Sequence, residues 1–131
     1  MKLLLDTHIW LWSVAEPKRL SRRVGAALQS SKHELWLSPI SVWELLLLSE
    51  KGGVELDRPG ESWVENAFAV LPLRDAPLTR GVAIESRRLQ LPHQDTADRF
   101  IAATARVYEL TLVTADERLM RVEGLGVLAN R

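Results

Sequence analysis

The sequence predicts a single α/β domain over residues 1–131, with a central, mostly parallel sheet flanked by helices. Short strand-like runs of large apolar residues alternate with segments of helical spacing, which is typical of a parallel sheet covered on both faces. The chain has 131 residues, of which 47% are hydrophobic. That length and composition suffice for one buried core and leave no room for two.

Three runs are expected to form strands, in the order in which they occur. Residues 2–5 are short and apolar, residues 34–38 are rich in large side chains, and residues 110–114 read Leu-Thr-Leu-Val-Thr. Residues 70–73 and 126–128 could add two further strands. Each pair of consecutive strands is separated by enough chain for a helical crossover.

Six segments between these runs carry the apolar spacing of helices. They span residues 7–15, 21–30, 40–51, 61–69, 78–89 and 97–109, and a shorter helix is expected at 117–122. Gly52-Gly53, Pro59-Gly60 and Pro77 mark turns between them. The sequence contains no internal repeat or low-complexity linker, so these turns are not expected to separate domains.

The overall charge and the cysteine content exclude several classes of protein. Lys and Arg number 17, as do Asp and Glu, so the net charge is zero and any basic surface must be local. With no cysteine, disulfide scaffolds, thiol nucleophiles and cysteine-bound zinc are excluded. No apolar stretch reaches the length of a membrane span or signal peptide. We therefore expect a soluble, cytoplasmic protein with no membrane partner.

Acidic residues occur where the predicted strands end or the next helices begin. Asp6 closes the first strand, Asp116 follows the strand at 110–114, and Glu44 lies early in the helix after the strand at 34–38. Asp95 and Asp98 stand at the start of another helix. In open parallel sheets, ligands bind beyond the carboxyl ends of the strands. We expect all five carboxylates to meet at this edge.

Each acid also has a structural explanation. Ser41-Val42-Trp43-Glu44 matches a capping box, in which the glutamate bonds a backbone amide. Asp95 and Asp116 can each cap the helix that follows. Asp6 is harder to explain, because an acid at the end of a buried strand loses its hydration unless a hydrogen-bonding or cationic group meets it.

The functional explanation is that the carboxylates share a divalent cation. Like charges from separate segments repel one another unless protons or a cation neutralise them. Oxygen ligands suit Mg²⁺ or Mn²⁺, and one or two ions could occupy the same acids. Such an ion activates water and stabilises the leaving oxygen in phosphoryl chemistry. No nucleophilic side chain is then required.

Four segments together resemble the signature segments of the PIN-domain nucleases. In order, they are Asp6-Thr7-His8-Ile9-Trp10, Ser38-Pro39-Ile40-Ser41-Val42-Trp43-Glu44-Leu45, His93-Gln94-Asp95-Thr96-Ala97-Asp98-Arg99 and Val113-Thr114-Ala115-Asp116. The likeness covers nearly the whole chain, and the small size is similar to that of VapC-type toxins of toxin–antitoxin pairs. Thr96 departs from the proline that many relatives have there.

This resemblance implies a PIN-like domain that acts as a Mg²⁺- or Mn²⁺-dependent endoribonuclease. It assigns catalysis and metal binding to Asp6, Glu44, Asp98 and Asp116, with Thr114 as a supporting hydroxyl. It also implies an RNA substrate, a homodimer, and a cognate antitoxin whose tail enters the acidic groove. Asp95 and Asp98 are three residues apart on one helical face, so spacing leaves open which of them binds metal; Asp98 is preferred.

Other residues near this edge have candidate roles in RNA binding. Arg99, beside Asp98, is expected to contact RNA phosphate. His8 or His93 could approach the acids, and Trp10 or Trp12 could stack on a base.

The helix at 40–51 is apolar on all sides, and it either meets a partner or lies fully covered inside the domain. The alternative function is a noncatalytic PIN-like module that binds RNA or protein. Clustered negative charge where phosphate must approach argues against that alternative.

Overall fold

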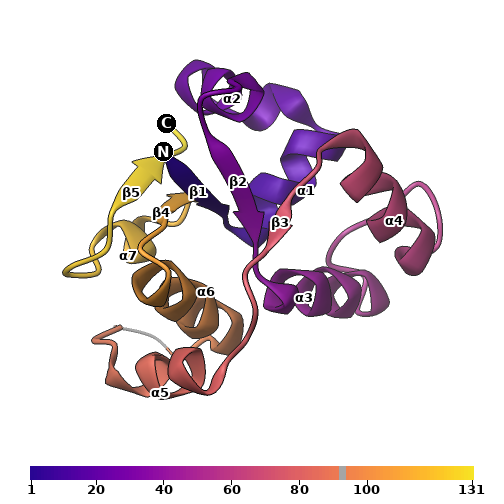
Figure 1. The fold of residues 1–131 in the computed structure, drawn as a ribbon. Coiled ribbons are helices and arrows are strands. Elements are labelled where there is room, and N and C mark those ends of the chain that lie inside the picture. Colours follow the sequence, from indigo (N-terminus) through magenta and orange to yellow (C-terminus); the bar gives the residue numbers. More distant parts are fainter. Residues whose placement is uncertain (92–93) are drawn as a thin grey trace.

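Five parallel strands form the centre of the molecule, with helices on both faces (Figure 1). This computed structural model describes residues 1–91 and 94–131. The strands lie in the order β3-β2-β1-β4-β5. Their bounds are β1 (Lys2–Leu5), β2 (Glu34–Leu37), β3 (Arg74–Asp75), β4 (Thr111–Thr114) and β5 (Val127–Ala129). The predicted fold class is thus confirmed, and every pairing is parallel.

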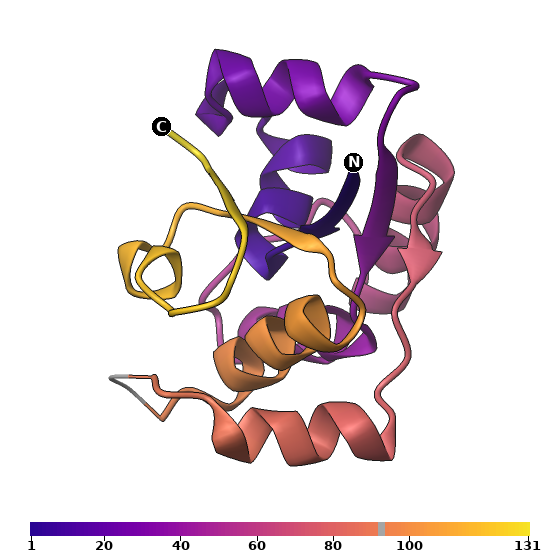
Figure 2. The same ribbon diagram turned by 60° about the vertical axis from the view of Figure 1, so that its left-hand side comes forward.

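The helices form two layers that enclose the sheet. They are α1 (Thr7–Ala15), the 3₁₀ helix η1 (Pro17–Arg19), α2 (Arg22–Gln29), α3 (Pro39–Glu50), α4 (Gly60–Val70), α5 (Arg80–Arg88), α6 (Thr96–Val107) and α7 (Glu117–Met120). In Figure 2, α2 lies above the strands and α5 and α6 lie below them.

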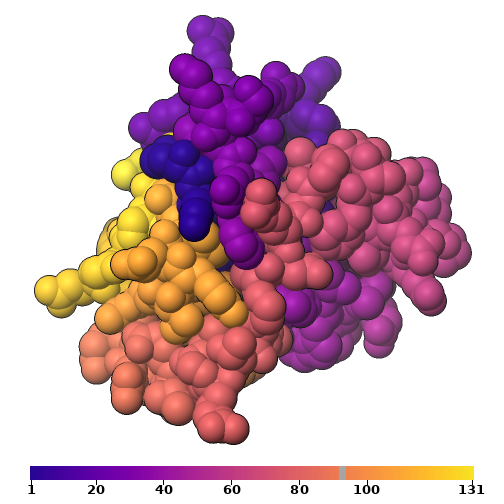
Figure 3. All heavy atoms as spheres, in the orientation of Figure 1, coloured from indigo at the N-terminus to yellow at the C-terminus, as the bar shows by residue number. Residues whose placement is uncertain are grey.

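Strand β1 is buried on both faces, which explains its uninterrupted run of apolar residues. It lies between β2 and β4, and Leu3, Leu4 and Leu5 are all fully buried. Leu4 belongs to the core cluster built with α5, α6 and α7, whereas Leu3 and Leu5 belong to the cluster built with α1, α2 and α4. A strand covered on both faces needs no polar alternation. The start of this strand is at the surface (Figure 3), in agreement with the exposed Lys2.

The structure corrects one expected strand. Residues 70–73 do not form a strand: residue 70 ends α4, and β3 follows as Arg74–Asp75. Pro72 explains the difference, because proline has no N–H to donate to a ladder. The strand predicted at 126–128 is found one residue later, as Val127–Ala129.

The other boundaries shift by only a few residues, and capping side chains account for two of the shifts. Ser38 accepts a hydrogen bond from the amide of Ile40 at 3.1 Å, so α3 begins at Pro39 and β2 ends at Leu37. Thr79 caps α5 by accepting from the amide of Val82 at 3.2 Å. Among the described residues, no helix is long and apolar enough to cross a membrane.

Helix α3 packs against α1, α4 and α6, and part of its surface stays exposed. Leu45 is fully buried, whereas Trp43 on the same helix has an exposed fraction of 49%. A helix with apolar residues on all sides therefore leaves part of its surface uncovered in the single chain.

Candidate active site

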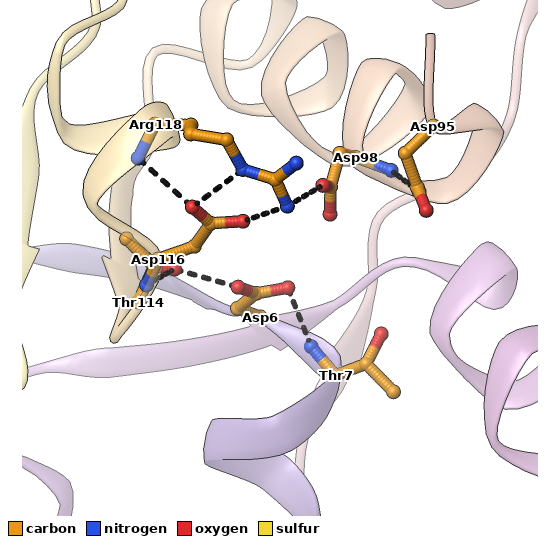
Figure 4. A network of polar contacts seen from close by, with 7 residues as sticks. All are labelled: Asp6, Thr7, Asp95, Asp98, Thr114, Asp116 and Arg118. Carbon is orange, nitrogen blue, oxygen red and sulfur yellow. Dashed lines mark hydrogen bonds and ion pairs between the residues drawn. The ribbon is translucent and has the colours of Figure 1, made fainter. Parts of the chain in front are cut away.

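The carboxyl ends of β1 and β4 bring the first and last acidic segments together. The register pairs Leu5 with Val113, and the amide of Asp6 donates to the carbonyl of Val113 at 2.9 Å. Asp6 therefore lies beside Thr114, whose hydroxyl donates to Asp6 Oδ2 at 2.6 Å. The same hydroxyl oxygen accepts from the amide of Asp116 at 3.0 Å, so Thr114 connects the two acids (Figure 4).

A pocket of about 280 Å³ opens at this edge of the sheet. All five predicted acids line it, as the strand-end positions suggested. The lining residues are Asp6, His8, Trp12, Glu44, Asp95, Asp98, Ala115, Asp116 and Arg118. The acids come from the end of β1, from α3, from the start of α6 and from the turn after β4, so the fold gathers carboxylates that lie far apart in the sequence.

The amino-terminal end of α6 presents two of these acids. Asp95 is the N-cap, and its Oδ1 accepts from the amide of Asp98 at 2.9 Å. The side chain of Asp98 is only 12% exposed and lies 3.8 Å from Arg118. The expected cap at Asp95 is thus confirmed, and both acids line the pocket.

Glu44 does not form the predicted capping box. The N-cap of α3 is Ser38, so Ser41 lies inside the helix and cannot serve as the cap. The Ser41 hydroxyl instead accepts from the hydroxyl of Thr7 at 3.0 Å. Glu44, one turn into the helix, is left to line the acidic pocket.

Burial raises the pKa of two of the carboxyl groups. For Asp6, loss of hydration raises the pKa above its usual 3.8, and the charge of Asp116 adds to this; hydrogen bonds from Thr114 and Thr7 and the charge of His8 oppose it. The pKa of Glu44 is also raised, first by burial and then by the charges of Asp6 and Asp95. Burial thus favours the protonated form of both carboxyl groups in the metal-free pocket.

Arg118 is the residue of this pocket that the sequence analysis missed. Its Nε and Nη2 lie 3.2 and 3.0 Å from the two carboxylate oxygens of Asp116, and Nη2 is 3.8 Å from Asp98 Oδ2. Asp116 also caps α7 by accepting from the backbone amide of Arg118 at 2.8 Å. The sequence did contain a signal for Arg118. It stands two positions after Asp116, and a residue two positions after an N-cap lies in the first turn of the helix.

Arg99 is in the wrong place for the predicted contact with RNA. It has an exposed fraction of only 8%, and its Nη1 donates to the carbonyls of Ser86 at 2.8 Å and Leu89 at 3.3 Å. The guanidinium therefore binds the carboxyl-terminal end of α5. This position contradicts the expectation that Arg99 contacts RNA phosphate.

The candidate aromatic and histidine residues differ in whether they line the acidic pocket. Trp10 is fully buried and packs edge-on against Trp63, with 5.4 Å between ring centroids, so it cannot stack on a base. Trp12 lines both the acidic pocket and an adjoining cavity of about 720 Å³, and the Arg19 guanidinium lies 4.3 Å above its ring. His8 lines both the acidic pocket and this cavity, whereas His93 lies outside the described residues.

The donor chemistry of the pocket suits a hard divalent cation. Its ligands are carboxylate oxygens, which Mg²⁺ and Mn²⁺ favour. Within residues 1–91 and 94–131, no three acidic or histidine side chains are grouped closely enough to enclose one ion. Mg²⁺ needs no such cage, because it usually keeps several waters and binds one or two protein carboxylates. The residues therefore fit the ion without forming a complete coordination shell.

The sequence is similar to those of known proteins over most of its length. Residues 3–125 match the model of the PIN domain family. Ribonuclease VapC22 of Mycobacterium tuberculosis is 37% identical over 120 residues, which cover 89% of this chain and 88% of that protein.

Solved structures share the fold at lower identity. One is VapBC2 from Rickettsia felis bound to a DNA fragment from their promoter, with a TM-score of 0.72, 17% identity and coverage of 98% of both chains. Another is VapBC-1 from nontypeable Haemophilus influenzae, with a TM-score of 0.68, 16% identity and the same coverage of both chains.

Proposed function

Because the chain belongs to the PIN domain family, we propose that it is a metal-dependent endoribonuclease and the toxin of a toxin–antitoxin pair. The observation that carries this proposal is the meeting of five carboxylates from four separate segments in one pocket at the edge of the sheet. The relative named ribonuclease VapC22 supports RNA as the substrate, since 37% identity extends over most of both chains.

The carboxylates that would hold a Mg²⁺ or Mn²⁺ ion in this pocket, directly or through its waters, are Asp6, Glu44, Asp98 and Asp116, with Asp95 as the alternative to Asp98. When bound, such an ion supplies an activated water and neutralises the charge that grows on the leaving oxygen. Thr114 fixes the orientation of Asp6 by donating to its Oδ2. The orientation of Asp6 matters because small displacements of groups in an active site reduce reaction rates strongly.

Glu44 lies in the same pocket as Asp6 and Asp95. Burial raises its pKa and the charges of Asp6 and Asp95 add to this, whereas a hydrogen bond from Thr7 and the charge of His8 oppose it. A divalent cation in the pocket would favour the ionised carboxylate instead. We therefore assign Glu44 to the carboxylates that hold the ion.

The partners follow from the same family membership. The similar structures are VapBC proteins, one of them bound to DNA, which supports an antitoxin as the partner of this chain. A basic side chain from the antitoxin tail would complement the negative charge of the acidic pocket. A second copy of the chain would cover the exposed face of α3 that carries Trp43.

The test is cleavage of RNA by the purified protein with Mn²⁺ or with EDTA. Wild-type protein is expected to cut RNA only with the metal ion. Asp6→Asn and Asp116→Asn should each lose activity by about 10–100-fold or more, which is the loss seen when even a supporting residue of a metal site is removed. Asp75→Asn is the matched control, because Asp75 is exposed and is not among the residues that line the pocket.

Two results would overturn the proposal. Equal cleavage in EDTA would contradict metal dependence, and full activity of Asp6→Asn would remove that residue from the reaction. RNA binding without cleavage under both conditions would instead support the noncatalytic PIN-like module. The unfolding temperatures of the variants must match that of wild type for each comparison to count.

A further inference from the structure

Arg118 forms a two-point contact with Asp116 inside the acidic pocket. Its Nε is 3.2 Å from Oδ1 and its Nη2 is 3.0 Å from Oδ2, so the flat guanidinium faces both oxygens of one carboxylate (Figure 4). The same Nη2 lies 3.8 Å from Asp98 Oδ2. One cation therefore connects acids from the turn after β4 and from α6.

The surroundings make this cation unusual in the pocket. Of the described residues that line it, Arg118 is the one arginine or lysine, beside five carboxylates and His8. The side chain of Arg118 is 53% exposed, whereas those of Asp98 and Asp116 are 12% and 23% exposed. The two acids are thus largely shielded from solvent, whereas the arginine side chain has open space toward solvent.

Arg118 and a divalent ion compete for the same oxygens. Asp98 and Asp116 belong to the acids assigned above to metal binding, and the guanidinium already faces both oxygens of Asp116. An ion bound there would place two further positive charges beside the arginine, which repels it. The contacts that Arg118 would lose are partly exposed ion pairs, and such pairs contribute little net stability.

We propose that Arg118 takes the place of the divalent ion in the metal-free pocket, and that metal binding releases its guanidinium to contact an RNA phosphate at the pocket rim. This inference rests on the proposed nuclease function. A guanidinium presents the same two-point geometry to phosphate as to carboxylate, so the released side chain keeps a suitable ligand. Arg118 would then be a substrate-positioning residue that is available only in the metal-loaded protein.

The first experiment measures Mn²⁺ binding by calorimetry in the absence of RNA. Arg118→Gln should bind Mn²⁺ about two- to fivefold more tightly than wild type, which is the effect expected on removing a partly exposed ion pair. Arg118→Lys keeps the charge and loses the two-point contact, so its affinity for Mn²⁺ should lie between those of wild type and Arg118→Gln. Arg121→Gln, which removes an exposed arginine paired with Glu117, controls for the general effect of charge and should match wild type.

The second experiment measures binding of a cleavage-resistant 2′-O-methyl RNA. With Mn²⁺, Arg118→Gln should bind this RNA more weakly than wild type, and the slope of log affinity against log salt should fall by about one. In EDTA the two proteins should bind equally, because Arg118 is then held by Asp116. Arg121→Gln again serves as the control.

These results separate the inference from the function on which it rests. Mn²⁺ affinity of Arg118→Gln equal to or weaker than that of wild type would overturn the competition with metal. An equal loss of RNA affinity with Mn²⁺ and with EDTA would overturn the release. A wild-type protein that cleaves no RNA would refute the proposed function, whereas the Mn²⁺ measurement would still test the competition.

Discussion

Thr114 donates a 2.6 Å hydrogen bond to Asp6 across 108 positions of the sequence. The contact exists because β1 and β4 are neighbours in the sheet and end at the same edge. The oxygen of the same hydroxyl accepts the amide of Asp116, so one side chain orders both acids. Thr114 is completely buried, which keeps water from replacing it.

Replacing Thr114 by valine should therefore damage both stability and activity. The variant removes the hydroxyl that the buried Asp6 carboxylate and the half-buried Asp116 amide share, and the expected loss is about 1–3 kcal/mol in the free energy of unfolding. RNA cleavage should fall because Asp6 loses its fixed orientation. Urea denaturation and a cleavage assay measure the two effects. Thr114→Ser keeps the hydroxyl and should retain most of the activity; a serine variant as inactive as valine would refute this explanation.

The raised pKa of Asp6 predicts a pH-dependent stability for the metal-free protein. The folded state holds the proton of Asp6 more tightly than the unfolded state, in which the pKa is near 3.8. This group therefore favours folding below that pH, and the contribution is lost as pH rises through the raised folded value. In EDTA, wild type should lose more stability than Asp6→Asn as the pH rises from 3.8 to neutral. Urea denaturation at several pH values measures the difference between the two proteins.

Metal provides the control for that experiment. Mn²⁺ binds the ionised carboxylates, so it should reduce the difference in pH dependence between wild type and Asp6→Asn. The pH profile in EDTA would contradict the prediction if both proteins showed the same slope.

Arg99 is predicted to affect stability and to leave RNA binding unchanged. Its guanidinium donates to two carbonyls at the end of α5, and Arg99→Met would leave these acceptors without their donor. The expected loss is about 1–3 kcal/mol in the free energy of unfolding. Arg87→Met, at an exposed position of α5, is the control and should have little effect. A smaller salt dependence of RNA binding in folded Arg99→Met would restore the role that the sequence suggested.

Trp12 and Trp10 should behave differently although only two positions separate them. Trp12 lines the acidic pocket, so Trp12→Ala should weaken RNA binding by about 1–3 kcal/mol, the usual effect of losing a stacked base. Trp10→Phe should lower the stability and leave RNA affinity unchanged, because Trp10 is buried against Trp63 and Phe68. Unchanged affinity in Trp12→Ala would show that no base stacks there.

Much of the fold follows from local sequence. The run from Leu3 to Leu5 predicts a strand covered on both faces, and helix bounds follow from apolar spacing and from caps such as Asp95. The acidic edge is also predictable, since a carboxylate at the end of a parallel strand lies at the edge where ligands bind. Local patterns are sufficient for these features because each depends on residues close together in the chain.

Tertiary structure decided which side chains face the pocket. Asp98 and Arg99 are adjacent in sequence, yet consecutive positions on a helix point about 100° apart. The packing of α5 on α6 turns Arg99 toward the carbonyls of α5 and leaves Asp98 at the acidic edge. Proximity in sequence to an acid therefore does not place an arginine in the pocket: Arg118 lines it, whereas Arg99 is buried against α5.

The role of Arg118 likewise depends on contacts between distant segments. The turn after β4 and the start of α7 bring Asp116 and Arg118 opposite Asp98 on α6, an arrangement set by the order of strands and by helix packing. The sequence determined the helices, the acidic edge and every strand except β3, because local side-chain chemistry specifies them. Only the folded chain determined which cation meets those acids, because the direction of a side chain depends on the surface against which its helix packs.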